Sequence, residues 1–326
     1  MPEGHTLHRL AQALDAAFAG TRPAASSPQG RFESGAALLD GELVVRASAW
    51  GKHLFLEYDG GHWLNVHLGL IGKFSVEQYD PAPGPPPVWG AVRLRLLTDT
   101  HVADLRGATV CQVVTPDQVD AILERLGPDP LRSGQDPDVA WARVEKSRRS
   151  VAELLMDQSI VAGVGNVYRC EVLFRHRVDP FRPGRELRHA TWQLLWDDLV
   201  RLMPLGVAFN QIITVEDQVV EAEALVAAGQ VPVLVAVHTD SARRRLSGPA
   251  GVLAAAVSDS SAALLADETD EEGLDEEDLT GPVSFERRYD VYRRQGMACP
   301  VCGSKIRTRI VAGRNLFWCG RCQRRR

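Results

Sequence analysis

Residues 299–322 read CPVCGSKIRTRIVAGRNLFWCGRC, and the fold at the end of the chain follows from this segment. It contains two Cys-x-x-Cys pairs separated by sixteen residues, Cys299 with Cys302 and Cys319 with Cys322. Four thiolates at this spacing surround one tetrahedral Zn²⁺, with one pair at each end of a hairpin. A closed shell of four sulfur ligands predicts a structural zinc rather than a catalytic one.

The charge around this segment indicates a nucleic-acid partner. Residues 287–326 hold twelve Arg or Lys and one acidic residue. The net charge of -5 hides this excess, because residues 267–278 contain nine acidic and no basic residues, and without them 37 basic residues face 33 acidic ones. A basic end on a nearly neutral body predicts a polyanionic partner, most simply nucleic acid. Arg314 lies at the predicted hairpin tip, where it can probe a DNA groove.

The remaining composition is that of a soluble protein with two or three domains. At 326 residues, of which 45% are hydrophobic and 24% charged, the chain can bury a sizeable core. The sequence shows neither a signal peptide nor an apolar run long enough to span a membrane. The two cysteines outside the zinc site, Cys111 and Cys170, do not make a disulfide scaffold, so the sequence favours a reducing cytoplasm.

Residues 1–125 predict an N-terminal helix followed by an antiparallel β-sandwich. Apolar residues recur at helical spacing over residues 6–19, and residues 23–36, rich in Ser, Pro and Gly, are expected to form a loop. Between residues 41 and 114 short apolar runs alternate with turns, which indicates strands. Residues 79–90 must form a loop, because their many prolines cannot donate to a strand ladder.

The rest of the chain completes an α+β multidomain fold. Residues 216–284 show weak periodicity and are expected to be an insertion or linker that is partly disordered, and residues 285–326 form the zinc ribbon. Residues 126–215 predict a helical domain, with helical periodicity in four segments divided by Gly or Pro: 138–147, 150–158, 166–176 and 189–203.

The first residues of the chain offer an unusual nucleophile. If the initiator Met1 is removed, Pro2 carries a secondary α-amine, and an α-amino group titrates with a pKa of about 7.7–8.0. Attack by this amine on a sugar aldehyde carbon gives an iminium ion, and Glu3 could relay protons at the same carbon. The alternative is that Pro2 only precedes a first helix, where proline is tolerated.

Three further motifs have a structural as well as a functional interpretation. Lys52 follows Gly51 in a turn and by itself suggests a solvated lysine. The step at Gly165 and Asn166 either caps the preceding helix or holds a phosphate at the N-terminus of the next one. Leu70 lies in a glycine-bracketed turn, where it is either part of the core or a wedge that fills a base stack.

Together these motifs resemble the formamidopyrimidine-DNA glycosylase/endonuclease VIII family. They are the N-terminal PEG, GKHLFLEY, HLGLIGKF, DQSIVAGVGNVYRCEVLF and the C-terminal Cys-x-x-Cys knuckles. The resemblance covers residues 1–210 and 285–326, and the start MPEGHT is closer to the endonuclease VIII branch than to the purine-specific branch. It implies a bifunctional DNA glycosylase and AP lyase of base excision repair, which removes oxidised bases, pyrimidines favoured, from damaged double-stranded DNA.

The resemblance also implies a role for each candidate residue. Pro2 would form a Schiff base and drive β,δ-elimination, with Glu3 as the proton donor and Lys52 as a phosphate-binding catalytic residue near the lesion. The other candidates would contact DNA: Gly165 and Asn166 in a helix–two-turn–helix phosphate clamp, Leu70 in the void left by the extruded base, and Arg314 on the backbone beside the lesion, where it is needed for the second elimination.

The implied protein is a cytoplasmic, nucleoid-associated monomer with one structural Zn²⁺, no nucleotide cofactor and no membrane partner. It departs from the family pattern at Thr6, where the family often has a second Glu, and at residues 216–283, where the family has a short connection. Two alternatives remain open, a glycosylase for oxidised purines and a non-enzymatic zinc-ribbon DNA-binding protein. A pure binder has no reason to keep Pro2, Glu3 and Lys52 together.

Overall fold

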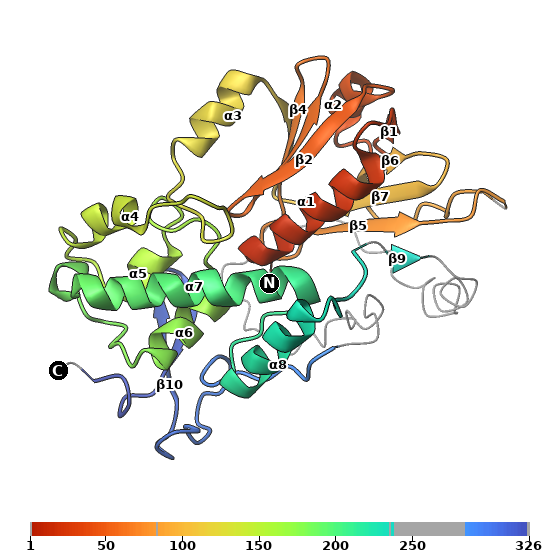
Figure 1. The fold of residues 1–326 in the computed structure, drawn as a ribbon. Helices are drawn as coiled ribbons and strands as arrows, with labels where there is room; N and C mark the ends of the chain where they lie inside the picture. Colours follow the sequence, from red (N-terminus) through yellow and green to blue (C-terminus); the bar gives the residue numbers. More distant parts are fainter. Residues whose placement is uncertain (1, 83, 235, 238–283, 325–326) are drawn as a thin grey trace, which may run out of the picture.

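The computed structural model describes residues 2–82, 84–234, 236–237 and 284–324, which form a β-sandwich domain, a helical domain and a small ribbon (Figure 1). Neighbouring strands in the sandwich are antiparallel, except that β9 runs parallel to β5. The predicted sandwich is therefore confirmed. One sheet has the order β1 (Ala24–Ser26), β6 (Val92–Leu97), β7 (His101–Arg106), β5 (Lys73–Gln78) and β9 (Ala236–Val237). The other has the order β2 (Val44–Trp50), β3 (His53–Tyr58), β4 (Trp63–His67) and β8 (Val110–Val114).

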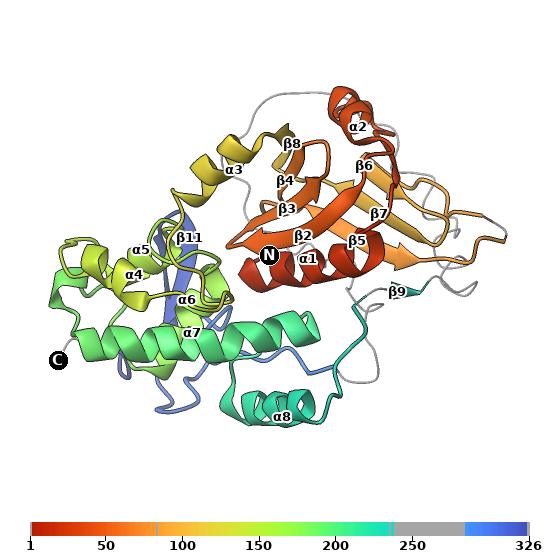
Figure 2. The same cartoon turned by 45° about the horizontal axis from the view of Figure 1, so that its top comes forward.

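Helix α1 (Gly4–Phe18) carries the start of the chain and closes the sandwich core, as the periodicity of residues 6–19 predicts. Leu7, Leu14 and Phe18 are buried in one cluster with residues of both sheets. Burial of each such side chain contributes about 1.5–3 kcal/mol. The packing fixes α1 along its length, so its first turn is held at the end of the sandwich that faces the helical domain (Figure 2).

Five of the runs between residues 41 and 114 that indicate strands, VVRASAW, HLFLEY, WLNVHLGL, VRLRLLTD and ATVCQVV, contain β2, β3, β4, β6 and β8, whereas β5 and β7 were missed. Residues 23–36, expected to form a loop, contain β1 and the start of α2 (Glu33–Leu39), so that prediction was wrong. β1 has only three residues and forms because they pair with β6, a contact between distant segments that leaves no local signal in the sequence. The proline-rich loop over residues 79–90 joins β5 to β6, as predicted.

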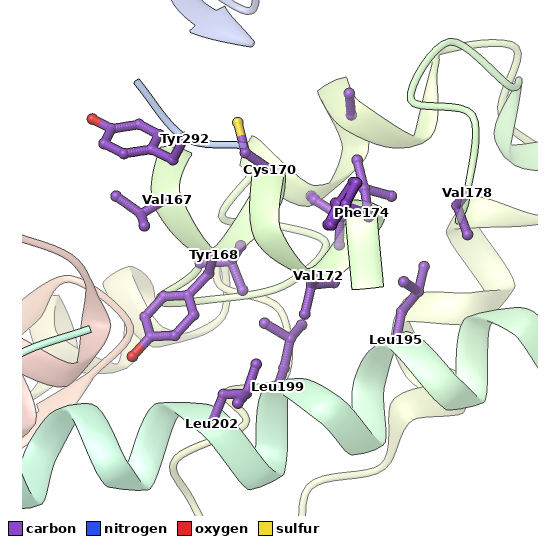
Figure 3. Packing of buried hydrophobic residues seen from close by; sticks show 14 of the residues in the cluster. Val167, Tyr168, Cys170, Val172, Phe174, Val178, Leu195, Leu199, Leu202 and Tyr292 are labelled. Carbon is purple, nitrogen blue, oxygen red and sulfur yellow. The ribbon is translucent and has the colours of Figure 1, made fainter. Parts of the chain in front are cut away.

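Helix α6 (Asn166–Arg175) lies at the centre of the helical domain, and every residue from Asn166 to Phe174 is buried. Figure 3 shows its side chains against Leu195, Leu199 and Leu202 of the long helix below it. No helix in the described part of the chain is long and apolar enough to cross a membrane. The four predicted helices are present as α4 (Pro137–Val144), α5 (Val151–Met156), α6 and α7 (His189–Phe209). The sequence analysis did not predict helix α3 (Pro116–Leu123) or the short 3-10 helix η1 (Gly184–Glu186).

The segment predicted as a linker, 216–284, begins instead with a helix. Helix α8 (Glu216–Ala227) buries Val219 and Ala222 and packs on α7, where Arg201 forms ion pairs with Glu216 and Glu223. Two buried apolar positions give only a weak periodicity, and the partner helix is distant in sequence, so this helix was missed. The expectation of disorder over residues 238–283 lies outside the described residues.

The ribbon is the predicted hairpin, formed by β10 (Arg307–Val311) and β11 (Arg314–Trp318). Ala312 and Gly313 make its two-residue tip, with φ of 54° and 70°. Leu316 and Phe317 are buried in the same core as α6, and β11 lies against that helix (Figure 2). The ribbon is therefore an integral part of the helical domain and not a module on a tether.

Glu171 of α6 connects the helical domain to the segment that leads into the ribbon. Its carboxylate is fully buried and accepts the backbone N–H groups of Asp290, Val291 and Tyr292 at 2.8, 2.9 and 2.9 Å. It also accepts the hydroxyl of Thr214 at 3.1 Å. Burial raises the pKa of Glu171, and the backbone N–H groups oppose that shift.

We predict that Glu171→Ala lowers the free energy of unfolding by about 3 kcal/mol, because it leaves three backbone donors without their acceptor. Chemical denaturation monitored by circular dichroism measures this change. Glu221→Ala, at an exposed position of α8, is the control and should change the stability by less than about 0.5 kcal/mol. Equal losses for the two variants would contradict the assigned role of Glu171.

Candidate active site and zinc centre

Three glycine-containing segments meet where α1 begins. The Gly4 N–H donates to the carbonyl of Gly163 at 2.8 Å. A Cβ on Gly4 would lie 2.8 Å from the Cα of Gly163, and one on Gly51 would lie 2.9 Å from the Cβ of Ala162. Real Cβ atoms do not approach so closely. The N-terminal motif, the lysine turn and the loop before α6 are therefore packed backbone against backbone.

Glu3 occupies the N-terminus of α6. It is fully buried, and its carboxylate accepts the N–H groups of Gly165 at 2.9 Å and Val167 at 2.8 Å. Gly165, the N-cap residue, has no side chain of its own to cap the helix. Glu3, which belongs to the other domain, supplies the hydrogen-bond acceptor instead. A negative charge at this end of a helix also interacts favourably with the helix dipole.

Burial raises the pKa of Glu3 above its ordinary value, although Lys52 and the N–H groups of α6 lower it. The carboxyl group therefore holds its proton to a higher pH than an exposed glutamate does. A raised pKa favours the role of proton donor.

Lys52 lies in the same region as Glu3 and two arginines. Burial lowers the pKa of Lys52, the neighbouring cations Arg314 and Arg169 lower it further, and Glu3 raises it. Three cations thus face one carboxylate of the protein. Such a site has the charge to bind a phosphate.

Asn166 and Arg169 hold the ribbon tip on α6. The Asn166 side-chain amide is buried and donates to the carbonyl of Asn315 at 2.9 Å, while its oxygen accepts from Arg169. Arg169 is fully buried and donates to the carbonyl of Val311 at 3.0 Å. These bonds place the half-exposed Arg314 at the N-terminus of α6.

Arg169 was missed by the sequence analysis, although a signal was present. In GNVYRCEVLF it stands three residues after Asn166, which puts both side chains on one helix face. For Gly165 and Asn166, the sequence left open a helix cap or a phosphate site. In this structure the Gly165 N–H and the Asn166 side chain both bond within the protein.

Leu70 projects into solvent from the turn between β4 and β5. Leu70 is 50% exposed and its neighbour Ile71, which the sequence analysis did not single out, is 80% exposed. His67 stabilises the turn, because its ring nitrogen accepts a hydrogen bond from the N–H of Gly69 at 3.1 Å. Leu70 is therefore not a core residue. The ring of His67 lies 5.2 Å from that of His53, so the turn adjoins Lys52.

The four ribbon cysteines form a site suited to zinc. Their sulfur atoms all lie within 4.8 Å of one another, with 3.8 Å between Cys299 and Cys322 and 3.4 Å between Cys302 and Cys319. A tetrahedral site with Zn–S bonds of about 2.3 Å has sulfur atoms about 3.8 Å apart. The donor set and the spacing fit one structural Zn²⁺, as the sequence predicts.

We predict that Gly165→Ala abolishes the function of Glu3, because the new Cβ would lie 2.3 Å from the Glu3 carboxyl carbon. Loss of a positioned proton donor slows the reaction by about 10²-fold or more. Single-turnover cleavage of a duplex with an abasic site measures the effect. Gly60→Ala, whose Cβ would meet only the flexible end of Glu42, is the control. A normal rate for Gly165→Ala would show that the contact with α6 is dispensable.

We predict that the purified protein contains about one zinc per chain and that Cys319→Ser loses it, together with much of the DNA affinity, because zinc binding and ribbon folding are coupled. Metal analysis and a DNA-binding titration measure both effects. Cys111→Ser, in β8 and outside the cluster, should keep the metal. Full zinc content in Cys319→Ser would disprove the assignment of this ligand.

Three known family models match parts of the chain. Residues 1–111 match the formamidopyrimidine-DNA glycosylase N-terminal domain, residues 126–217 match the formamidopyrimidine-DNA glycosylase H2TH domain, and residues 297–325 match a zinc finger found in FPG and IleRS. The matches place a family model on the sandwich, the helical domain and the ribbon.

Individual relatives cover nearly the whole chain. Endonuclease 8 1 of Mycobacterium tuberculosis is 42% identical over 325 residues, which is 99% of this chain and 100% of that protein. The formamidopyrimidine-DNA glycosylase of Thermus thermophilus is 29% identical over 290 residues, or 88% and 85% of the two chains.

Solved structures of the same family share the fold. The Lactococcus lactis Fpg in complex with DNA containing an abasic site superposes with a TM-score of 0.67 at 19% identity, covering 99% of this chain and 100% of that one. The MutM (FPG) protein from Thermus thermophilus gives a TM-score of 0.65 at 25% identity, covering 99% and 98% of the two chains. With a relative at 42% identity over its full length and a family model on each domain, the chain belongs to the formamidopyrimidine-DNA glycosylase/endonuclease VIII family of DNA glycosylases.

Proposed function

We propose that this protein is a bifunctional DNA glycosylase and AP lyase that removes oxidised bases, pyrimidines favoured, from double-stranded DNA by means of a Pro2 Schiff base. The observation that carries the proposal is the surroundings of the chain start. Immediately after Pro2 lies a buried carboxyl group with a raised pKa, which interacts electrostatically with Lys52, and Lys52 in turn is influenced by Arg314 and Arg169. Amine, proton donor and phosphate-binding cations are the three components that the reaction requires.

The chemistry starts with an extruded nucleotide, since a base inside the duplex is out of reach of a protein amine. Once Met1 is removed, the Pro2 nitrogen bonds to C1′, the bond from C1′ to the base breaks, and the base leaves with a proton. An iminium between Pro2 and C1′ also requires that the sugar ring opens, and Glu3, the proposed proton donor, gives the ring oxygen its proton. The iminium makes the C2′ hydrogen acidic, so elimination expels the 3′ phosphate and a second elimination expels the 5′ phosphate.

The remaining residues hold the bent DNA. Leu70, with Ile71 beside it, fills the gap in the base stack, where apolar wedges stabilise kinked duplexes. Lys52 and Arg314 contact the phosphates on either side of the extruded nucleotide. Gly165 and Asn166 lie in this phosphate clamp and support it from the helical domain, through their bonds to Glu3 and to the ribbon tip. We propose that the protein acts on DNA as a monomer in the cytoplasm, at the nucleoid.

The preference for pyrimidines is supported by the 42% identity to a protein named Endonuclease 8 1 and by the MPEGHT start. Relatives named formamidopyrimidine-DNA glycosylase are less similar, at 29% identity for the Thermus protein. The non-enzymatic alternative is disfavoured by the set of Pro2, Glu3 and Lys52, because a pure DNA-binding protein has no reason to keep these three residues together.

We predict that the protein with a free Pro2 amine is trapped covalently by borohydride on duplexes with an oxidised pyrimidine or an abasic site. A variant with an uncleavable N-terminal extension should bind the same duplexes and give neither adduct nor strand cleavage, because its proline nitrogen is an amide without basicity. Gel separation of the adduct and of the cleaved strand measures both results, and a duplex with 8-oxoguanine tests lesion preference.

Two outcomes of this experiment would correct the proposal. If the extended variant cleaves abasic DNA at the normal rate, Pro2 is not the nucleophile and Lys52 is the next candidate amine. If trapping on 8-oxoguanine exceeds trapping on the oxidised pyrimidine, the alternative activity on oxidised purines is the correct one.

A further inference from the structure

Arg9 of α1 makes contacts that the proposed chemistry does not use. Its side chain is buried, at 6% exposure, and burial lowers the pKa of its guanidinium. The guanidinium donates to the carbonyls of Val207 and Ala208, at 2.9 Å each, and to that of Val233 at 2.6 Å. Among the residues that the structure describes, no carboxylate pairs with it. Three carbonyl oxygens are what stabilise this buried cation.

Two of these carbonyls belong to the last turn of α7. The final carbonyls of a helix have no partner within the helix, and the negative end of the helix dipole lies there. A buried guanidinium donates hydrogen bonds to these unpaired carbonyls and also places a positive charge at the negative end of the helix dipole. Arg9 therefore joins α1 of the sandwich domain to the C-terminal end of the long helix of the helical domain.

The third carbonyl belongs to a segment that crosses between the domains. We call residues 228–234 and 236–237, which follow α8, the strap. The strap begins after α8, and α8 is fixed to α7 through the ion pairs of Arg201. The strap ends in β9, which pairs with β5 of the sandwich, Ala236 with Glu77 and Val237 with Gln78. Figure 2 shows α8 below α7 and β9 beside β5. Arg9 holds the middle of the strap.

We infer that Arg9 is a positioning residue that couples the sandwich domain to the helical domain before DNA arrives. The inference rests on the proposed function, because it concerns how the site for that reaction is assembled. Pro2 and Glu3 precede α1, and the N–H groups that donate to Glu3 are at the N-terminus of α6 in the other domain. Fixing α1 to α7 keeps the chain start beside the N-terminus of α6. The binding energy of DNA is then not consumed in bringing the two domains together.

The test uses Arg9→Met in the full chain, which keeps the length of the side chain and removes its donors. Binding to a duplex with a tetrahydrofuran abasic-site analogue should weaken about tenfold, since DNA must now supply the free energy that closes the two domains. Single-turnover cleavage of abasic DNA at saturating enzyme should stay within about twofold of the wild-type rate. Hydrogen exchange should accelerate in peptides from the end of α7 and from the β5–β9 edge.

Arg22→Met is the matched control, because Arg22 is an exposed arginine of the same domain whose side chain, within the described part of the chain, bonds to Gly41 and Asp59. If Arg9→Met does not fold, Ala236→Pro tests the strap from its other end by removing a backbone donor from β9 while leaving Arg9 in place. Like Arg9→Met, this variant should have a higher Kd for the duplex and faster hydrogen exchange at the β5–β9 edge.

Unchanged Kd and unchanged exchange in these variants would overturn the inference. A lower rate at saturating enzyme with a normal Kd would overturn it as well, because Arg9 would then act at the reaction centre. The exchange measurement needs no enzymatic activity, so a failure of the proposed function would leave this readout intact and the two failures can be told apart.

Discussion

The site depends on one interaction between groups 162 residues apart, the Glu3 carboxylate on the N–H of Gly165. This bond and its companion to Val167 convert the N-terminus of α6 from a site open to any anion into a site filled by the protein itself. The contact can form only because Gly165 has no Cβ, and Gly4 and Gly51 let the neighbouring backbones approach. The same contact therefore caps a helix, buries the Glu3 carboxyl group and places the chain start at the domain interface.

Helix α6 extends this role to the ribbon. Asn166 and Arg169 hold the carbonyls of the ribbon tip, and Glu171, two residues further, holds the segment that precedes the ribbon. These polar groups are all buried, and a buried polar group is tolerable only when its partners are in place. Sandwich, helical domain and ribbon are thus positioned by one helix, through directional bonds that permit a single arrangement.

The sequence alone was sufficient for the elements and motifs whose chemistry is local. Four cysteines in two Cys-x-x-Cys pairs indicate a zinc site from the sequence alone. The helical spacing of apolar residues in α1 and α7 can also be recognised without knowledge of the fold. It was insufficient for β1 and α8, which are stabilised by partners far away in the chain. It also gave no indication that Glu3 would meet α6, because that contact depends on the tertiary packing of two domains. Lys52 taken by itself suggested a solvated lysine, and its electrostatic interaction with Glu3, Arg169 and Arg314 became apparent only in the folded structure.

The charge distribution explains why such a site can exist in a chain of net charge -5. Lys52, Arg169 and Arg314 repel one another, and the lowered pKa of Lys52 records both that repulsion and the loss of solvent. Glu3 offsets only part of this cost, because its own pKa is raised by burial. The repulsion among these cations is therefore only partly offset in the free protein, and we propose that phosphates of bound DNA supply the missing negative charge. Under the proposed function, the binding energy of DNA would then be concentrated where the nucleotide has to be held outside its helix.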